Sequence, residues 1–238
     1  MTGLKVTVLV PTLNEIDGMR VILPLIKREW YDQLLIIDGG STDGTVEYAR
    51  GQGYQVLMQK TKGIRRAYIE ALDYMTGDMV IPFSPDGNSI PEAIPQLANK
   101  MKEGNYDMVI ASRYAEGARS EDDDWLTGFG NWTFTKLINL CHGGHYKDAM
   151  GMYRAWKPEL LRTLDLDKEE SFATEKLTGV SGIGLDPLLA IRCLKRKLKV
   201  CEIPVSEPKR IGGTRKMLPF RWGLPLLLQI FRELYYWR

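Results

Sequence analysis

The hydrophobic residues of the N-terminal half fall into short runs, and each run ends in a polar turn. Residues 6–10 and 34–37 are apolar, largely β-branched segments of the length expected for buried strands of a parallel sheet. Further strands are predicted at 54–58, 78–83 and 108–112. Helices are predicted between the strands, at 16–29, 45–51, 63–75 and 91–103. This alternation indicates right-handed βαβ units and therefore an α/β fold with a mostly parallel sheet flanked by helices.

The pattern changes after residue 112. A charged loop at 116–124 carries five acidic residues and is predicted to be solvated or mobile. Helices are predicted at 125–140 and 185–195, and a strand at 198–205. The chain has no internal repeat and no low-complexity linker, so one domain of 238 residues is the simplest interpretation.

Composition narrows the function classes. The formal net charge of +2 is too small to indicate a nucleic-acid partner. The three cysteines fit neither a disulfide framework nor a metal-binding spacing, so reduced thiols of a cytoplasmic protein are expected. No signal peptide is visible, and no apolar run reaches the ~18 residues that a membrane-spanning helix needs.

Two aspartates follow predicted strands at the sheet edge where α/β proteins bind ligands. Asp38 begins an Asp-Gly-Gly turn, where it either hydrogen-bonds a nucleotide base or ribose or serves as an ordinary turn residue. Asp86 lies in a Pro-Asp-Gly-Asn turn. Its carboxylate either holds Mg²⁺ or Mn²⁺ beside a diphosphate or is again ordinary turn chemistry.

A basic loop at 209–216 contains four cations and two adjacent glycines. Glycine allows a ligand to approach the backbone closely, and Arg and Lys neutralise phosphate oxygens. The loop therefore suits a phosphate ligand, although a solvated surface loop would have the same composition.

The order of these segments along the chain resembles the inverting family 2 glycosyltransferases, which have the Rossmann-like GT-A fold. The dolichyl- or polyprenyl-phosphate mannosyl- and glucosyltransferase branch is the most similar. Residues 36–45, Ile-Ile-Asp-Gly-Gly-Ser-Thr-Asp-Gly-Thr, carry the most specific match. The segments at 10–15, 62–67, 111–114, 148–155, 202–205 and 210–216 also resemble family motifs, so the likeness extends from residue 6 to about 220.

The resemblance implies transfer of a sugar from a nucleoside-diphosphate sugar, assisted by Mg²⁺ or Mn²⁺, with inversion at the anomeric carbon. It implies a donor half at 1–112, an acceptor half at 113–206, and a basic loop with an amphipathic segment at 207–238. Asp86 is the implied metal ligand. The implied donor-binding residues are Pro11, Thr12, Asn14, Glu15, Asp38, Gly39, Ser41, Gly63, Arg66, Ser84, Pro85, Asp86, Arg113, Arg210, Arg215 and Lys216.

Three positions depart from the family pattern. The metal motif Asp-x-Asp reads Ser84-Pro85-Asp86 here, so one carboxylate is missing. Gly151 and Met152 stand where the family usually has Ser-Gly. Arg215 adds a positive charge to the basic loop, which favours a phosphorylated ligand.

The acceptor implied by the resemblance is a polyprenyl phosphate or a glycan hydroxyl. A hydroxyl needs a carboxylate base, for which Asp148 is the first candidate and Asp186 the second. A lipid phosphate is already anionic, and Asp148 would then orient other groups. Asp148 is alternatively a structural partner of a cation such as Arg154.

The C-terminal segment 222–237 mixes aromatic and aliphatic residues with Arg232. It is predicted either to lie at the inner face of a membrane as a peripheral contact or to pack on the domain or on a second subunit. Two other functions stay open at this level: a nucleotidyl- or substituted-phosphoryl-transferase with a nucleotide-linked donor, and a non-catalytic nucleotide- or glycan-binding module.

Overall fold

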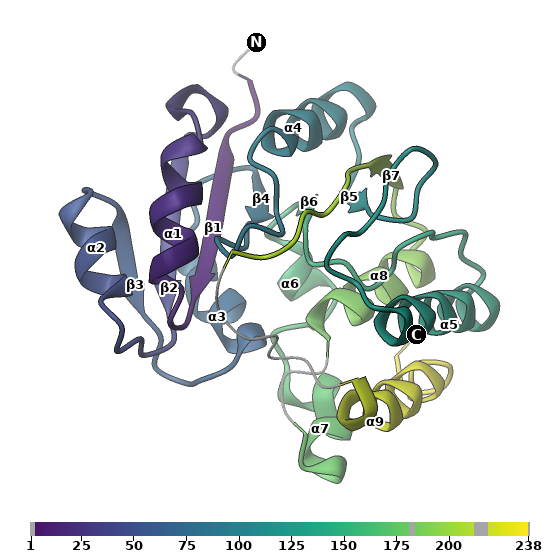
Figure 1. Cartoon of the computed structure of the whole chain (residues 1–238). Helices are drawn as coiled ribbons and strands as arrows, with labels where there is room; N and C mark the ends of the chain where they lie inside the picture. Colours follow the sequence, from purple (N-terminus) through teal and green to yellow (C-terminus); the bar gives the residue numbers. More distant parts are fainter. Residues whose placement is uncertain (1–2, 181–183, 212–218, 238) are drawn as a thin grey trace.

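The computed structural model describes residues 3–180, 184–211 and 219–237. Its seven strands form one sheet in the order β3-β2-β1-β4-β6-β5-β7 (Figure 1). Only β6 runs antiparallel to its neighbours within this sheet. The mostly parallel α/β fold is therefore confirmed. The strands are β1 (Val6–Thr12), β2 (Gln33–Asp38), β3 (Gln55–Met58), β4 (Met79–Pro82), β5 (Met108–Ser112), β6 (Arg154–Trp156) and β7 (Val200–Pro204).

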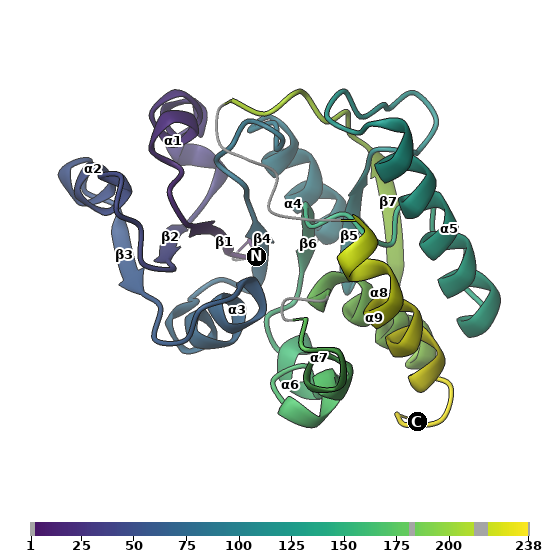
Figure 2. The same ribbon diagram turned by 60° about the horizontal axis from the view of Figure 1, so that its bottom comes forward.

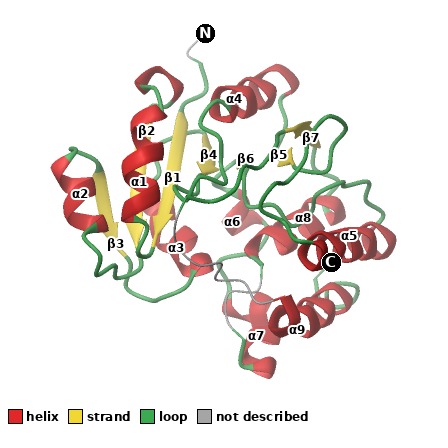
Figure 3. Ribbon diagram, in the orientation of Figure 1, coloured by secondary structure: helices red, strands yellow, loops and turns green. Residues whose placement is uncertain are grey.

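Helices lie on both sides of the sheet, as Figures 2 and 3 show. The side chains of β1 alternate between two cores: Val8 and Val10 pack with α1 and α4, whereas Leu9 packs with α3 and α8. This alternation is the expected result of burying both faces of a parallel sheet. The helices are α1 (Ile16–Ile22), α2 (Thr45–Gly51), α3 (Ile64–Ala71), α4 (Ala93–Gly104), α5 (Trp125–His142), α6 (Leu160–Thr163), α7 (Ala173–Thr178), α8 (Leu185–Lys195) and α9 (Pro219–Arg232).

The structure shortens the helix predicted at 16–29 and adds a strand that was not predicted. The single helix expected at 16–29 ends at Ile22, and 3₁₀ turns follow at Leu23–Leu25 and Arg28–Trp30. Pro24 explains the break, because proline has no N–H for the helical ladder and crowds the preceding turn. Strand β6 was not predicted, because three residues are too few to show a period.

The C-terminal helix α9 packs against α5, α7 and α8. A buried ion pair fixes the chain just after it, with Arg192 Nε on α8 lying 3.0 Å from Glu233 Oε2. Gln229 and Ile230 are also buried there, which confirms packing on the domain as one of the two expected placements. No helix within the described residues is long and apolar enough to cross a bilayer.

Candidate functional site

The carboxylate of Asp38 organises the turn after β2. Parallel register places Asp38 directly opposite Thr12, the last residue of β1. Asp38 is fully buried and accepts two backbone N–H bonds, from Gly40 at 2.9 Å and Ser41 at 2.8 Å. It also accepts the hydroxyls of Thr12 at 2.8 Å and Ser41 at 2.5 Å. These four donors satisfy the buried carboxylate and hold the Gly39–Ser41 turn. Direct contact of Asp38 with a base or ribose stays a prediction.

The loops after β1 and β2 are joined by hydrogen bonds between the side chains of one loop and the backbone of the other. Asn14 has a left-handed backbone (φ 56°), which asparagine tolerates better than most residues. Its N–H donates to Ser41 Oγ at 2.8 Å, and its Oδ1 accepts the N–H of Thr42 at 2.8 Å. The N–H of Glu15 donates to Thr45 Oγ1 at 3.1 Å. The two motif loops therefore form one rigid unit at the carboxyl ends of β1 and β2.

Helix α1 and the Ser84–Asp86 turn approach each other backbone to backbone. A Cβ added to Gly18 would lie 2.3 Å from the carbonyl oxygen of Pro85 and 3.0 Å from Cα of Asp86. Only glycine fits such a contact without moving the turn. Gly18 therefore positions Asp86, a role for which its sequence context gives no signal beyond a glycine inside a helix.

A basic segment and an acidic loop meet the polar turn. Arg210 Nη2 lies 3.7 Å from Asp86 Oδ2 and 3.3 Å from Asp122 Oδ2. Burial opposes ionisation of Asp122, but hydrogen bonds from Asn88 and Arg210 outweigh it and lower its pKa. The loop at 116–124, expected to be solvated or mobile, thus contributes a paired carboxylate to the site. Arg215 and Lys216 lie outside the described residues.

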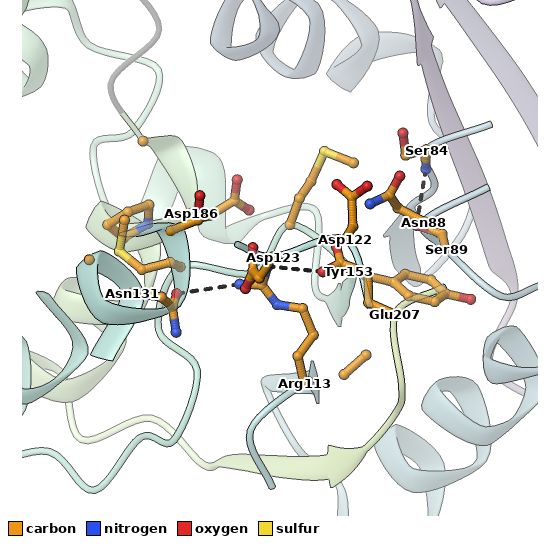
Figure 4. A pocket seen from close by; sticks show the side chains of 18 of the residues that line it. Ser84, Asn88, Ser89, Arg113, Asp122, Asp123, Asn131, Tyr153, Asp186 and Glu207 are labelled. Atoms are coloured by element: carbon orange, nitrogen blue, oxygen red, sulfur yellow. Dashed lines mark hydrogen bonds and ion pairs between the residues drawn. The ribbon is translucent and has the colours of Figure 1, made fainter. Parts of the chain in front are cut away.

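Arg113, at the end of β5, is held by three carboxylates. Its Nε lies 2.7 Å from Asp148 Oδ2, and Nη2 donates to Asp148 Oδ1 at 3.0 Å. Nη1 lies 3.4 Å from Glu207 and 3.8 Å from Asp123. Nη2 also donates to Asn131 Oδ1 at 3.3 Å. Figure 4 shows this guanidinium between Asn131 and the loop carboxylates.

The two candidate catalytic carboxylates differ in environment. Burial opposes ionisation of Asp148, but the bidentate Arg113 outweighs it and lowers the pKa of Asp148. Burial raises the pKa of Asp186, an effect that Arg154 only partly offsets. Asp186 Oδ1 has no hydrogen-bond partner in the described part of the chain and lies 3.6 Å from Nε of Arg154. Asp186 is thus the better proton acceptor, and Asp148 the better partner for a cation.

The loop after β3 places its two predicted donor residues away from this centre. Gly63 has φ 120°, and its carbonyl accepts the amide N–H of Gln59 at 2.7 Å. Arg66 Nη2 lies 2.9 Å from Glu169 Oε1, in a pair that is partly exposed. Both residues have structural roles here, and their contact with a donor stays a prediction.

A cavity of about 560 Å³ connects the polar turns to an apolar limb between α5, α8 and α9 (Figure 4). The predicted site residues that line it are Pro11, Glu15, Ser84, Asp86, Arg113, Asp186 and Arg210. Those that do not line it are Thr12, Asn14, Asp38, Gly39, Ser41, Gly63, Arg66, Pro85 and Asp148. The apolar limb is formed by Leu126, Phe129, Phe134, Met150, Met152, Leu185, Trp222 and Leu226. No group of three or more His, Cys, Asp or Glu residues that could hold a metal occurs within the described ranges.

Sequence reasoning missed several lining residues. Asn88 belongs to a turn that was singled out only for Asp86, and Asn131 lies within an otherwise apolar helix. Glu207 follows a strand and meets Arg113 only through the fold. Among these three, only Asn88, two residues from Asp86, carried a usable signal.

Comparison with known proteins identifies this arrangement. The family model described as glycosyl transferase family 2 matches residues 7–165, which include the Asp38 and Asp86 turns and the Arg113–Asp148 pair. The chain belongs to glycosyl transferase family 2. It is an enzyme of the hexosyltransferase type, and the predicted family is confirmed.

Three curated relatives span most of the chain. Glycosyltransferase AglJ of Haloferax volcanii is 30% identical over 233 residues, covering 96% of this chain and 71% of that protein. An undecaprenyl-phosphate mannosyltransferase of Micrococcus luteus is 25% identical over 224 residues, covering 90% and 88%. A dolichol-phosphate mannosyltransferase of Pyrococcus furiosus is 28% identical over 228 residues, covering 90% of this chain but 59% of that longer protein.

Solved structures support the fold. Glucosyl-3-phosphoglycerate synthase from Mycobacterium tuberculosis, in complex with Mn²⁺, UDP and glucosyl-3-phosphoglycerate, superposes with a TM-score of 0.66 at 21% identity. The match covers 98% of this chain and 80% of that one. The GT-A architecture expected from the sequence is confirmed.

Proposed function

We propose that this glycosyltransferase moves a hexose from a nucleoside-diphosphate sugar to a polyprenyl phosphate, with inversion at the anomeric carbon. The observation that carries the proposal is the two-part cavity. One end has carboxylates and an arginine, which suit a metal-bound diphosphate, and the other is a limb of aliphatic and aromatic side chains. An acceptor with a charged head and a hydrocarbon tail matches both ends. Two relatives are named for undecaprenyl phosphate and dolichol phosphate, which supports the same choice.

The polar end suits a divalent cation. Asp86 and Asp122 both approach Arg210, and the amide oxygen of Asn88 has no hydrogen-bond partner within the described residues. These oxygen donors are the kind that Mg²⁺ and Mn²⁺ prefer, and the substrate diphosphate would supply further ligands. Asp86, Asp122 and Asn88 would hold the ion, which when bound would neutralise charge on the leaving nucleoside diphosphate. Asp122 thereby offers a carboxylate in place of the one missing at Ser84.

The chain's own residues position the substrates. Asp148 holds the Arg113 guanidinium through two hydrogen bonds, and Arg113 lines the cavity. Arg210, on the loop after β7, lies beside Asp86 and can contact diphosphate oxygens. An acceptor phosphate is already a nucleophile, and Asp148 then acts as a positioning residue.

A hydroxyl acceptor is the second candidate, and Asp186 favours it. Burial raises the pKa of Asp186, a residue of the cavity lining. Its Oδ1 has no hydrogen-bond partner among the described residues and lies 3.6 Å from Nε of Arg154. Such a carboxylate can take a proton from a hydroxyl nucleophile. In that case activity should fall as pH drops through the raised pKa of Asp186, because protonation removes the base.

The test is transfer of labelled hexose from uridine- and guanosine-diphosphate sugars, with Mn²⁺ or with a chelator. A short-chain polyprenyl phosphate and the matching polyprenol serve as alternative acceptors. We expect transfer to the phosphate only, and we expect Asp86→Asn to lower its rate by roughly 100-fold. The exposed Asp73→Asn variant is the control. Transfer to the polyprenol, abolished by Asp186→Asn, would establish the second candidate instead.

We further propose that the enzyme works on the cytoplasmic side of a membrane as a peripheral protein. The three cysteines are unpaired, as expected in a reducing compartment. A lipid-linked acceptor also requires the cavity to open toward a bilayer.

A further inference from the structure

Helix α5 carries a row of exposed aromatic side chains, which we name the α5 ladder: Trp125, Phe129 and Trp132. Their exposed fractions are 82%, 53% and 56%. The rings stack along the helix, with centroids 5.8 Å apart between Trp125 and Phe129 and 6.1 Å apart between Phe129 and Trp132. Spacings of four and three residues place all three on one face. Burial in the core therefore does not account for these residues.

The same face continues beyond the ladder. Lys136 and Leu140 follow at helical spacing, and both are exposed, Leu140 almost completely. The opposite face of α5 carries Thr135 and Ile138, which are buried against the domain. The helix thus turns its largest apolar rings away from the face that packs on the domain. Large contiguous apolar surfaces of this kind mark interaction sites.

The ladder is continuous with the cavity through Phe129. This residue both lines the apolar limb and is half exposed on the outer surface. The wall of the apolar limb therefore reaches the molecular surface at the centre of the ladder. Helix α9 packs beside α5 and carries exposed apolar side chains of its own, Leu224 and Phe231. The two helices lie side by side in Figures 1 and 2.

We infer that the α5 ladder is the surface on which this enzyme docks to a lipid bilayer. The rings would lie in the headgroup region, and the apolar limb of the cavity would open to the lipid. The inference rests on the proposed polyprenyl-phosphate acceptor, whose tail lies in a membrane. Tryptophan is enriched at membrane–water interfaces, and Lys136 can extend its ammonium from the same face to the headgroups. A second copy of the chain covering the ladder would close the limb at Phe129, so self-association fits the cavity less well.

The docking should depend on apolar insertion more than on charge. Acidic residues Glu121 and Asp124 are exposed near the start of α5 and would oppose attraction to anionic lipid. We therefore expect binding to phosphatidylcholine vesicles with or without phosphatidylglycerol, and little loss at high salt.

The experiment measures flotation of the protein with these vesicles. The Trp125→Ser/Trp132→Ser variant should bind roughly tenfold more weakly, because two apolar rings are removed. Trp125→Phe/Trp132→Phe should retain binding but lose most quenching of tryptophan fluorescence by brominated lipid. The matched control is Val21→Ser/Leu25→Ser, since Val21 and Leu25 lie elsewhere on the surface and are about half exposed, a degree close to that of Trp132. Neither ladder tryptophan lines the cavity, so transfer to a water-soluble short-chain acceptor should be unchanged.

Three results would overturn the inference: vesicle binding equal in the serine variant and the wild type, no binding by the wild type, or a wild-type dimer that the serine variant dissociates. The last would assign the ladder to self-association. The proposed acceptor is tested separately, by the transfer assay. Failure of the wild type to glycosylate the short-chain phosphate would refute the acceptor, whatever the flotation result.

Discussion

Two regions beside the cavity are built in different ways: the loops after β1 and β2, which we propose bind the donor and name the donor end, and the Arg113 cluster, which we propose lies toward the acceptor and name the acceptor end. At the donor end, Asp38, Asn14 and Thr45 take their partners from two adjacent motif loops, and the turn residues satisfy one another. At the acceptor end, Arg113 meets Asp148, 35 residues away, and Glu207, 94 residues away. The donor end is held by hydrogen bonds between two neighbouring loops, whereas the acceptor end depends on ion pairs between segments farther apart in the chain. Substitutions at the acceptor end should therefore mainly lower the free energy of unfolding. Substitutions at the donor end should mainly displace the residues that we propose contact the donor.

The largest effect is expected from Asp148→Asn. Loss of the buried charge leaves Arg113 with only its longer contacts, and the free energy of unfolding should fall by about 3 kcal/mol. The pKa of Asp148 is lowered in the folded protein, so its contribution is complete above the ordinary carboxyl pKa of 3.8 and is lost as pH falls through the folded value. The variant should consequently lose less of its stability on acidification than the wild type. Urea unfolding at several pH values measures both effects.

Asp73→Asn is the matched control for that substitution, because the Asp73–Arg162 pair is largely exposed. Its stability should change by less than about 1 kcal/mol. An Asp148→Asn protein as stable as this control would show that the Arg113 pair does not hold the acceptor end together.

An intermediate effect is expected from Gly18→Ala at the donor end. The new methyl would overlap the Pro85 carbonyl and push the Asp86 turn away from its place. We expect a loss of about 1–3 kcal/mol in stability and a roughly tenfold weaker affinity for the nucleotide sugar, measured by calorimetry. Gly51→Ala, whose Cβ would meet nothing within 4 Å, should leave donor affinity unaltered. Equal donor affinity in both variants would contradict the positioning role of Gly18.

The smallest effect is expected from Arg66→Ala. Arg66 is about one third exposed, pairs with Glu169 and does not line the cavity. Its removal should change stability by less than about 1 kcal/mol and transfer by no more than about twofold. A tenfold rise in KM for the nucleotide sugar would instead support the donor contact that the family resemblance implies.

Much of the donor end could be predicted because its signals are local. A buried strand followed by Asp-Gly-Gly or Pro-Asp-Gly-Asn places a carboxylate at the sheet edge whatever the distant chain does. The roles of Asp122 and Glu207 could not be predicted, because an acidic residue in a loop looks solvated until a fold supplies its cation. The contrast between Trp156 in the core and Trp125 on the surface was equally hidden, since composition does not reveal which helix face is covered.

The sequence by itself determined the α/β class and the strand-end turns, because hydrophobic period and turn chemistry act over a few residues. The family was indicated by the resemblance of its motifs. It also supplied both candidate carboxylates, Asp148 and Asp186. Only the tertiary structure decided that Arg113 holds the first and that burial raises the pKa of the second. A pKa depends on the charges and solvent within a few ångströms, and residues far apart in the chain provide them.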